Sequence, residues 1–142
     1  MKFFMRFPSP PWGRAVLLIG VLVLALPIFA ASPAVAQTTE REKLDAAQKA
    51  FDAKNYTSAF YLWLSLAQGG NRGACFNIGR MYVYGTGAPV DYIEAYKWMH
   101  LAAEAGLPEA IAARAQLAAR MSAVDIKTAM DRAQEWKDDN GR

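Results

Sequence analysis

The chain has 142 residues, enough for one modest domain, and contains one histidine and one cysteine. Three of its 16 Lys/Arg residues precede Gln37, whereas none of its 13 Asp/Glu residues does, so residues 37–142 carry no net charge. This balance argues against a nucleic-acid partner, because such binding needs an excess of basic side chains. The histidine and cysteine together are too few for a metal site of three or four such ligands or for an internal disulfide. We therefore expect no metal and no other cofactor.

Residues 1–36 have the pattern of a secretory signal peptide. A basic segment without acids precedes the apolar run Ala15–Ala30, and Ala34-Val35-Ala36 fits the small-x-small cleavage pattern. The expected mature protein begins at Gln37 and is periplasmic or secreted. The alternative is a retained membrane anchor, which would make the protein a subunit of a membrane-anchored envelope complex. The apolar run is shorter than the roughly 20 residues of a spanning helix, which favours cleavage.

The remaining chain is predicted to be all-α. Alanine, the strongest helix former, accounts for 21 of residues 37–142, and no stretch shows sustained apolar/polar alternation. Thr39 with Glu42 has the capping-box pattern, Asp91 and Ser122 are candidate N-caps, and Pro108 suits a first helical turn. About six helices are expected, over residues 40–53, 56–68, 73–84, 91–105, 108–121 and 123–136.

The sequence repeats itself with a period of 36 residues. A shift by this period pairs Tyr56 with Tyr92, Ala59 with Ala95, Phe60 with Tyr96, Ala67 with Ala103, Gly70 with Gly106 and Ala74 with Ala110. A period in the mid-thirties built of two helices is typical of helical solenoids. Alanine and glycine allow two helices to approach closely, and the larger side chains, among them Trp63, Trp98 and Trp136, are expected to fill the core.

One repeat, at about residues 74–110, closely resembles the Sel1-like repeat (SLR) family, which is related to the tetratricopeptide repeats. The resemblance is carried by Ala74, Ile78, Gly79, Tyr82, Gly85, Thr86, Gly87, Asp91, Ala95, Trp98, Ala102, Ala103 and Gly106. The repeat at about 40–73 looks more like a tetratricopeptide repeat, because it lacks the G-x-G loop. Residues 108–138 resemble a degenerate capping pair.

The resemblance implies a right-handed α-solenoid of antiparallel helix pairs. It also implies an adaptor that binds a protein or a peptide, and exported bacterial members of the family are often linked to envelope processes. Some disulfide-rich relatives are associated with penicillin-type ligands, so a cell-wall or β-lactam hydrolase is an alternative. No serine of this chain has a lysine three residues later, and the cysteine framework is absent, so we do not expect an enzyme.

The remaining candidate residues have structural explanations. His100 lacks a recognisable nucleophile partner, and Cys75 in a close-packed helix is expected to be a buried thiol, with an intermolecular disulfide as the alternative. Gly85 and Gly87 do not fit the spacing of a phosphate-binding loop and are expected to form a turn that needs positive φ.

Asn77, Arg80 and Tyr84 are the candidate partner-binding residues. Their spacings of three and four place them on one helix face, between the expected packing positions. Related solenoids usually hold their ligands on the first helix of a repeat. The alternative is an ordinary solvated face.

Export gives the first testable prediction. N-terminal sequencing of the protein recovered from the cell envelope should give a chain that starts at Gln37, because the charged, apolar and small-residue segments occur in the order a signal peptidase requires. Recovery of the full-length chain in the membrane fraction would support the retained anchor.

Overall fold

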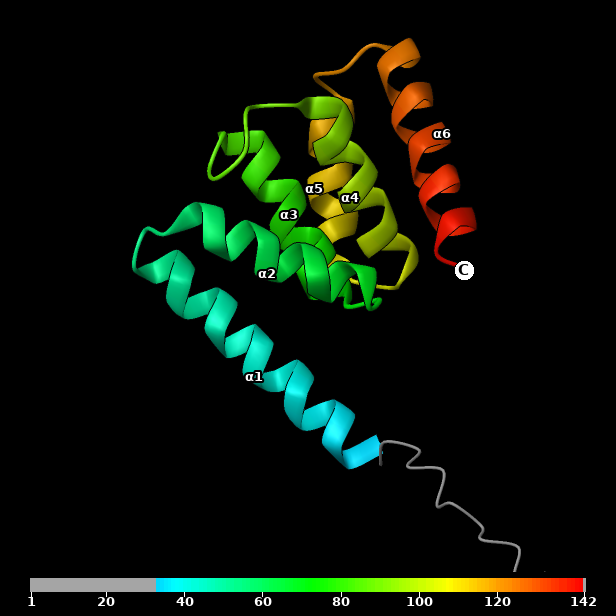
Figure 1. Ribbon diagram of the computed structural model, residues 1–142. Helices are drawn as coiled ribbons and strands as arrows, with labels where there is room; N and C mark the ends of the chain where they lie inside the picture. Colours follow the sequence, from blue (N-terminus) through cyan, green and yellow to red (C-terminus); the bar gives the residue numbers. More distant parts are fainter. Residues whose placement is uncertain (1–32, 142) are drawn as a thin grey trace, which may run out of the picture. The chain divides into compact units, whose positions relative to one another are not determined.

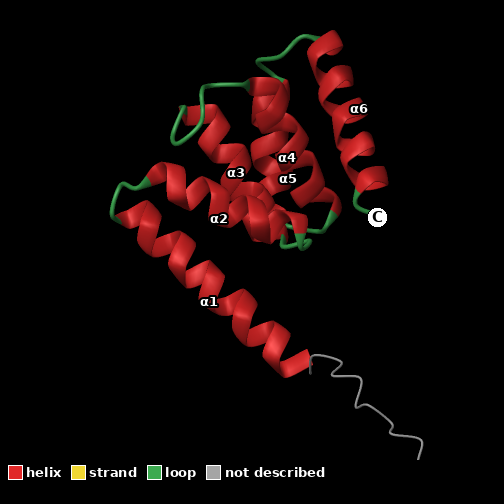
Figure 2. Ribbon diagram, viewed as in Figure 1, coloured by secondary structure: helices red, strands yellow, loops and turns green. Residues whose placement is uncertain are grey.

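The computed structural model describes residues 33–141, which form six α-helices and no strand (Figures 1 and 2). The helices are α1 (Pro33–Asp52), α2 (Tyr56–Gln68), α3 (Arg72–Tyr84), α4 (Tyr92–Glu104), α5 (Pro108–Ala118) and α6 (Ala123–Asp139). The all-α prediction is therefore confirmed for this part of the chain. The basic and apolar segments of the expected signal peptide lie outside the described residues.

Helix α1 starts at Pro33, well before the start near Glu40 that the capping-box pattern predicts. Thr39 lies inside the helix, so the prediction that it caps the helix is wrong. Ala34 and Ala36, just before it, are strong helix formers, and a proline is well tolerated in the first turn. A capping-box pattern does not mark the start of a helix when the residues before it also favour helix.

The predicted starts of α4, α5 and α6 are confirmed, whereas α5 ends at Ala118, before the predicted end near residue 121, and α6 continues to Asp139, beyond the predicted end near residue 136. The Asp91 carboxylate accepts hydrogen bonds from the backbone N–H groups of Ile93 and Glu94, at 2.9 and 3.0 Å. The Ser122 hydroxyl accepts from the Asp125 N–H at 3.1 Å, and Pro108 lies in the first turn of α5. Side-chain caps of this kind contribute about 1 kcal/mol each to stability.

Two further N-caps, Asn55 for α2 and Asn71 for α3, lie in the short turns before these helices. Asn71 also donates a hydrogen bond from its side-chain amide to Glu40 of α1, at 2.8 Å. The start of α3 is therefore connected to a helix two elements earlier in the chain.

The close contact between α3 and α4 depends on very small side chains. Ala74 of α3 and Ala95 and Ala102 of α4 have no exposed surface. A Cβ added at Gly79 would lie 2.9 Å from Met99 Cγ and 3.1 Å from the Ala95 carbonyl oxygen. A larger residue at position 79 would force the two helices apart.

Aromatic side chains fill the wider spaces between the helices. Trp63 and Trp98 are both 3% exposed, and Ile78 is completely buried. Trp136 of α6 is half-buried and packs edge-on against Trp98, with ring centroids 5.5 Å apart. Among the described residues, no polar or charged residue is buried, so the core is apolar.

The loop between α3 and α4 needs glycine at two positions. Gly85 and Gly87 have φ values of 64° and 79°, in the left-handed region that costs glycine little. A Cβ at Gly87 would lie 2.5 Å from the carbonyl oxygen of Tyr56, at the start of α2. The predicted turn is confirmed, and the loop also packs against the preceding repeat.

Helices α5 and α6 both pack against α4 (Figure 1). The small residues Ala129 and Ala133 of α6 are completely buried. Two ion pairs lie along the contact between α4 and α6: Glu94 with Arg132 at 2.9 Å, and Glu104 with Lys137 at 3.0 Å. Helix α4 is thus covered by α3, α5 and α6.

Gly79→Leu should destabilise the fold by about 1–3 kcal/mol, because the new side chain overpacks the contact with Ala95 and Met99. Urea unfolding followed by circular dichroism measures the change. Ala112→Leu, which adds the same side chain at an exposed position of α5, is the control and should stay within about 0.5 kcal/mol. A Gly79→Leu variant as stable as the original protein would contradict the close approach.

Candidate protein-interaction surface

Helix α3 has a buried face and an open face. Ala74, Ile78 and Met81 point into the core and are at most 2% exposed. Tyr84 is 72% exposed, Arg80 is exposed and Asn77 is half-buried. The last three form a row along the open face, which we call the α3 ridge.

A small hollow on one side of the α3 ridge brings the three predicted residues together. It is lined by Asn77, Arg80 and Tyr84, and also by Phe51, Trp63, Met81 and Thr86. The Phe51 ring of α1 lies between the rings of Trp63 and Tyr56, at centroid distances of 5.4 and 5.2 Å. The edge-on and tilted ring contacts hold Phe51 and Trp63 as the apolar part of the lining next to the ridge.

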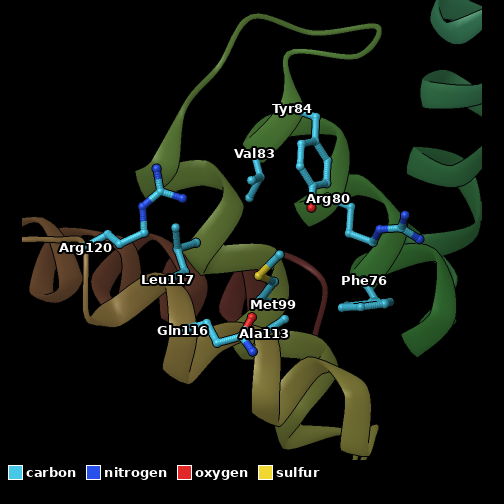
Figure 3. Close-up of a pocket in the computed structure, with 9 residues that line it drawn as sticks. All are labelled: Phe76, Arg80, Val83, Tyr84, Met99, Ala113, Gln116, Leu117 and Arg120. Carbon is cyan, nitrogen blue, oxygen red and sulfur yellow. The ribbon is translucent and has the colours of Figure 1, made fainter.

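A larger groove of about 300 Å³ lies on the other side of the α3 ridge, between α3 and α5 (Figure 3). Its lining consists of Phe76, Arg80, Val83, Tyr84, Met99, Ala113, Gln116, Leu117 and Arg120. Met99 and Leu117, which are 3% and 4% exposed, form its floor, and the two arginines lie on opposite sides of it. Arg80 and Tyr84 therefore border both hollows.

The residues predicted from the sequence did not include Phe76, Arg120, which lies in the turn after α5, or the groove residues of α5 itself. Nothing local marks them, because α5 reaches α3 only through the way both helices pack on α4. Arg120 could be noticed in the sequence as a basic residue, but the sequence does not show that it lies beside α3.

Both groove arginines contact aromatic rings. The Arg80 guanidinium carbon lies 5.9 Å from the centre of the Phe76 ring. That of Arg120 lies 5.1 Å from the centre of the Tyr92 ring, and its Nη2 donates a hydrogen bond to the Tyr92 hydroxyl at 3.0 Å. Within the described part of the chain, neither arginine forms an ion pair with a carboxylate.

Tyr82 lies on the other side of α3, where its ring packs edge-on against Phe60 at 5.5 Å. Burial raises the pKa of its hydroxyl, and the negative charges of Glu94 and Asp91 raise it further. The hydroxyl therefore stays protonated at neutral pH, as suits a packing residue.

His100 joins α4 to α5 through its contact with Arg114. Its Nδ1 lies 3.0 Å from the Arg114 guanidinium, which can only donate, so Nδ1 is the acceptor and the proton is on Nε2. Nε2 lies 3.5 Å from the Glu104 carboxylate, and the ring stacks on Tyr96. Burial lowers the His100 pKa, Glu104 opposes the shift, and Arg114 and Lys137 add to it. The neutral imidazole is thus the form that matches both the hydrogen bond from Arg114 and the lowered pKa.

Cys75 is 4% exposed in the core, among residues such as Ala74 and Trp98, and forms no disulfide within the described chain. A thiol in this position behaves as a small apolar side chain. An intermolecular disulfide would require the core to open at this point.

Residues 33–141 contain no group of three or more His, Cys, Asp or Glu side chains that is placed to hold a metal ion. Of the helices in residues 33–141, none combines the length and the apolar character needed to cross a bilayer.

The model of the Sel1 repeat matches residues 52–71 and 73–107. The second match covers α3, the glycine loop and α4, and the first covers α2 and the turns on both sides of it. The chain therefore carries Sel1 repeats, as the resemblance implied, and these repeats define its fold as a helical solenoid. No curated protein matches the chain significantly. Sel1 repeats indicate a protein that acts by binding other proteins.

His100 gives a prediction about pH. Because its pKa is lower in the folded chain than the ordinary value of about 6.5, acid protonates the unfolded chain first. Its contribution to stability is therefore present above about pH 6.5 and is lost as the pH falls towards the lower pKa of the folded state, by at most about 1.4 kcal/mol per pH unit.

Urea unfolding of the protein and of the His100→Gln variant between pH 7.5 and 5 measures this effect. Glutamine can still accept from Arg114 but does not titrate, so the variant should show a flatter profile. Identical profiles would show that His100 does not contribute.

Proposed function

We propose that this protein is an exported, non-catalytic repeat protein of the bacterial envelope that holds a protein or peptide partner on the α3 ridge. The Sel1 repeats support binding of a protein. The charged, apolar and small-residue order of residues 1–36 supports export. The proposed mature chain, from Gln37, would keep most of α1 and all later helices.

The observation that carries this proposal is the exposure of Arg80 and Tyr84 between two hollows. Tyr84 is 72% exposed, and Arg80 is exposed beside it and lines the same two hollows. Tyrosine and arginine contribute most often to the binding energy of protein interfaces. A partner side chain in either hollow would contact both residues.

The surroundings of Ser122 and His100 support a non-catalytic role. The Ser122 hydroxyl is a helix cap, and it also donates to the Asp125 carboxylate at 2.8 Å. His100 is engaged by Arg114 and by Glu104. A general base must be within reach of the proton it removes, and these contacts occupy both ring nitrogens.

Arg80→Ala and Tyr84→Ala should each weaken capture of the partner by about tenfold or more, which corresponds to about 1.4 kcal/mol. Both side chains are exposed, so the free energy of unfolding should change by less than about 0.5 kcal/mol. The measurement pairs thermal unfolding with pull-down from an envelope extract, using the same protein samples.

Tyr61→Ala is the matched control, because Tyr61 is also an exposed tyrosine, at 64%, but lines neither hollow. Equal capture by Tyr84→Ala and Tyr61→Ala would place the binding surface elsewhere. A large loss of stability in Arg80→Ala would show that the ridge has a structural role.

A further inference from the structure

The groove between α3 and α5 combines an apolar floor with positive charge that no carboxylate of the described chain neutralises. Phe76, Met99 and Leu117 supply the apolar surface, and Arg80 and Arg120 lie on opposite sides (Figure 3). The lining contains no acidic residue. This local excess stands out because residues 37–142 have no net charge.

The acidic residues of α4 are engaged on other sides of that helix. Glu94 pairs with Lys97 at 2.8 Å and with Arg132 at 2.9 Å, and Glu104 pairs with Lys137 at 3.0 Å. Asp91 caps α4. These contacts direct the carboxylates towards α6 or the backbone, so they do not neutralise the groove.

The two groove arginines are held in place while most of their N–H groups stay available. Arg120 stacks on Tyr92 and uses one N–H for the Tyr92 hydroxyl, and Arg80 lies over Phe76. A guanidinium fixed against a ring is well placed to bind a carboxylate through two parallel hydrogen bonds. The contacts with aromatic rings hold the guanidinium groups in place without neutralising their positive charge.

We propose that this groove binds an acidic peptide segment of a partner protein, with an aliphatic side chain on the Met99–Leu117 floor and glutamate or aspartate carboxylates on Arg80 and Arg120. The volume of about 300 Å³ is at the lower end for ligand pockets, so it fits one or two side chains of an extended segment. This inference rests on the proposed function and adds the chemistry of the partner.

Fluorescence anisotropy tests the proposal with labelled hexapeptide mixtures that have one fixed leucine and two fixed glutamates. Matched mixtures carry glutamine or lysine in place of glutamate. The protein purified after expression of the full chain should bind the glutamate mixture at least about tenfold more tightly than the glutamine mixture, since hydrogen bonds to charged groups are the stronger ones. Added salt should weaken the binding.

Variants of the two arginines identify the site. Arg80→Gln and Arg120→Gln should each lose about tenfold in affinity for the glutamate mixture. Arg41→Gln removes the same charge from the exposed surface of α1, outside both hollows, and should bind as the original protein does. The double variant R80E/R120E should bind the lysine mixture instead. Circular dichroism confirms that each variant is folded.

Several outcomes would overturn the proposal. Equal affinity for the glutamate and glutamine mixtures, or equal losses in Arg120→Gln and Arg41→Gln, would show that the groove does not select acidic peptides. Tighter binding of phosphatidylglycerol vesicles or of an oligonucleotide through the same arginines would replace the peptide with another partner. If a partner is captured on the α3 ridge without these preferences, this inference fails and the proposed function stands; if nothing is captured from the envelope extract, the proposed function fails.

Discussion

The close approach of α3 to α4 at Gly79 is the constraint on which the candidate surface depends. The space there is so small that a single added carbon would lie 2.9 Å from Met99 and 3.1 Å from the backbone of Ala95. Because α3 lies this close, Met99 fills the space beneath it and becomes the floor of the groove towards α5. The same contact turns Arg80 and Tyr84 away from the core. The ridge thus follows from the packing on the opposite face of its own helix.

Helix α4 is the centre of the described domain. It packs against α3 through small residues, against α6 through Trp98 and two ion pairs, and against α5 through the contact of His100 with Arg114. Helices in a solenoid are stable mainly through their neighbours, because a single pair cannot bury its apolar surface. Here one helix supplies buried surface to three others. The groove is therefore formed by two helices, α3 and α5, whose relative position is set by a third.

The two sides of α4 differ in how charge is used. On the α6 side, Glu94 and Glu104 are matched by lysine and arginine, and such partly exposed ion pairs contribute little stability, about 0–1 kcal/mol each. In the groove between α3 and α5, Arg80 and Arg120 lie against aromatic rings and form no ion pair with a carboxylate of the described chain. Ring contacts hold a guanidinium in place without cancelling its charge. This difference makes the groove, and not the α6 side, the surface suited to a charged partner.

Local features of the sequence determined the helices, two of their four side-chain N-caps, the glycine turn and the row formed by Asn77, Arg80 and Tyr84. Each of these depends on residues within a few positions of one another, through helical periodicity, side-chain capping or the freedom of glycine. The predicted start of α1 was wrong, because the capping pattern at Thr39 competes with strong helix formers before it. The tertiary structure alone decided that Arg120 and Arg80 lie on opposite sides of an apolar floor and that His100 receives a hydrogen bond from Arg114. These arrangements bring α5 and the turn after it next to α3 and α4, and their geometry is fixed by the packing angles of whole helices, which no short stretch of sequence specifies.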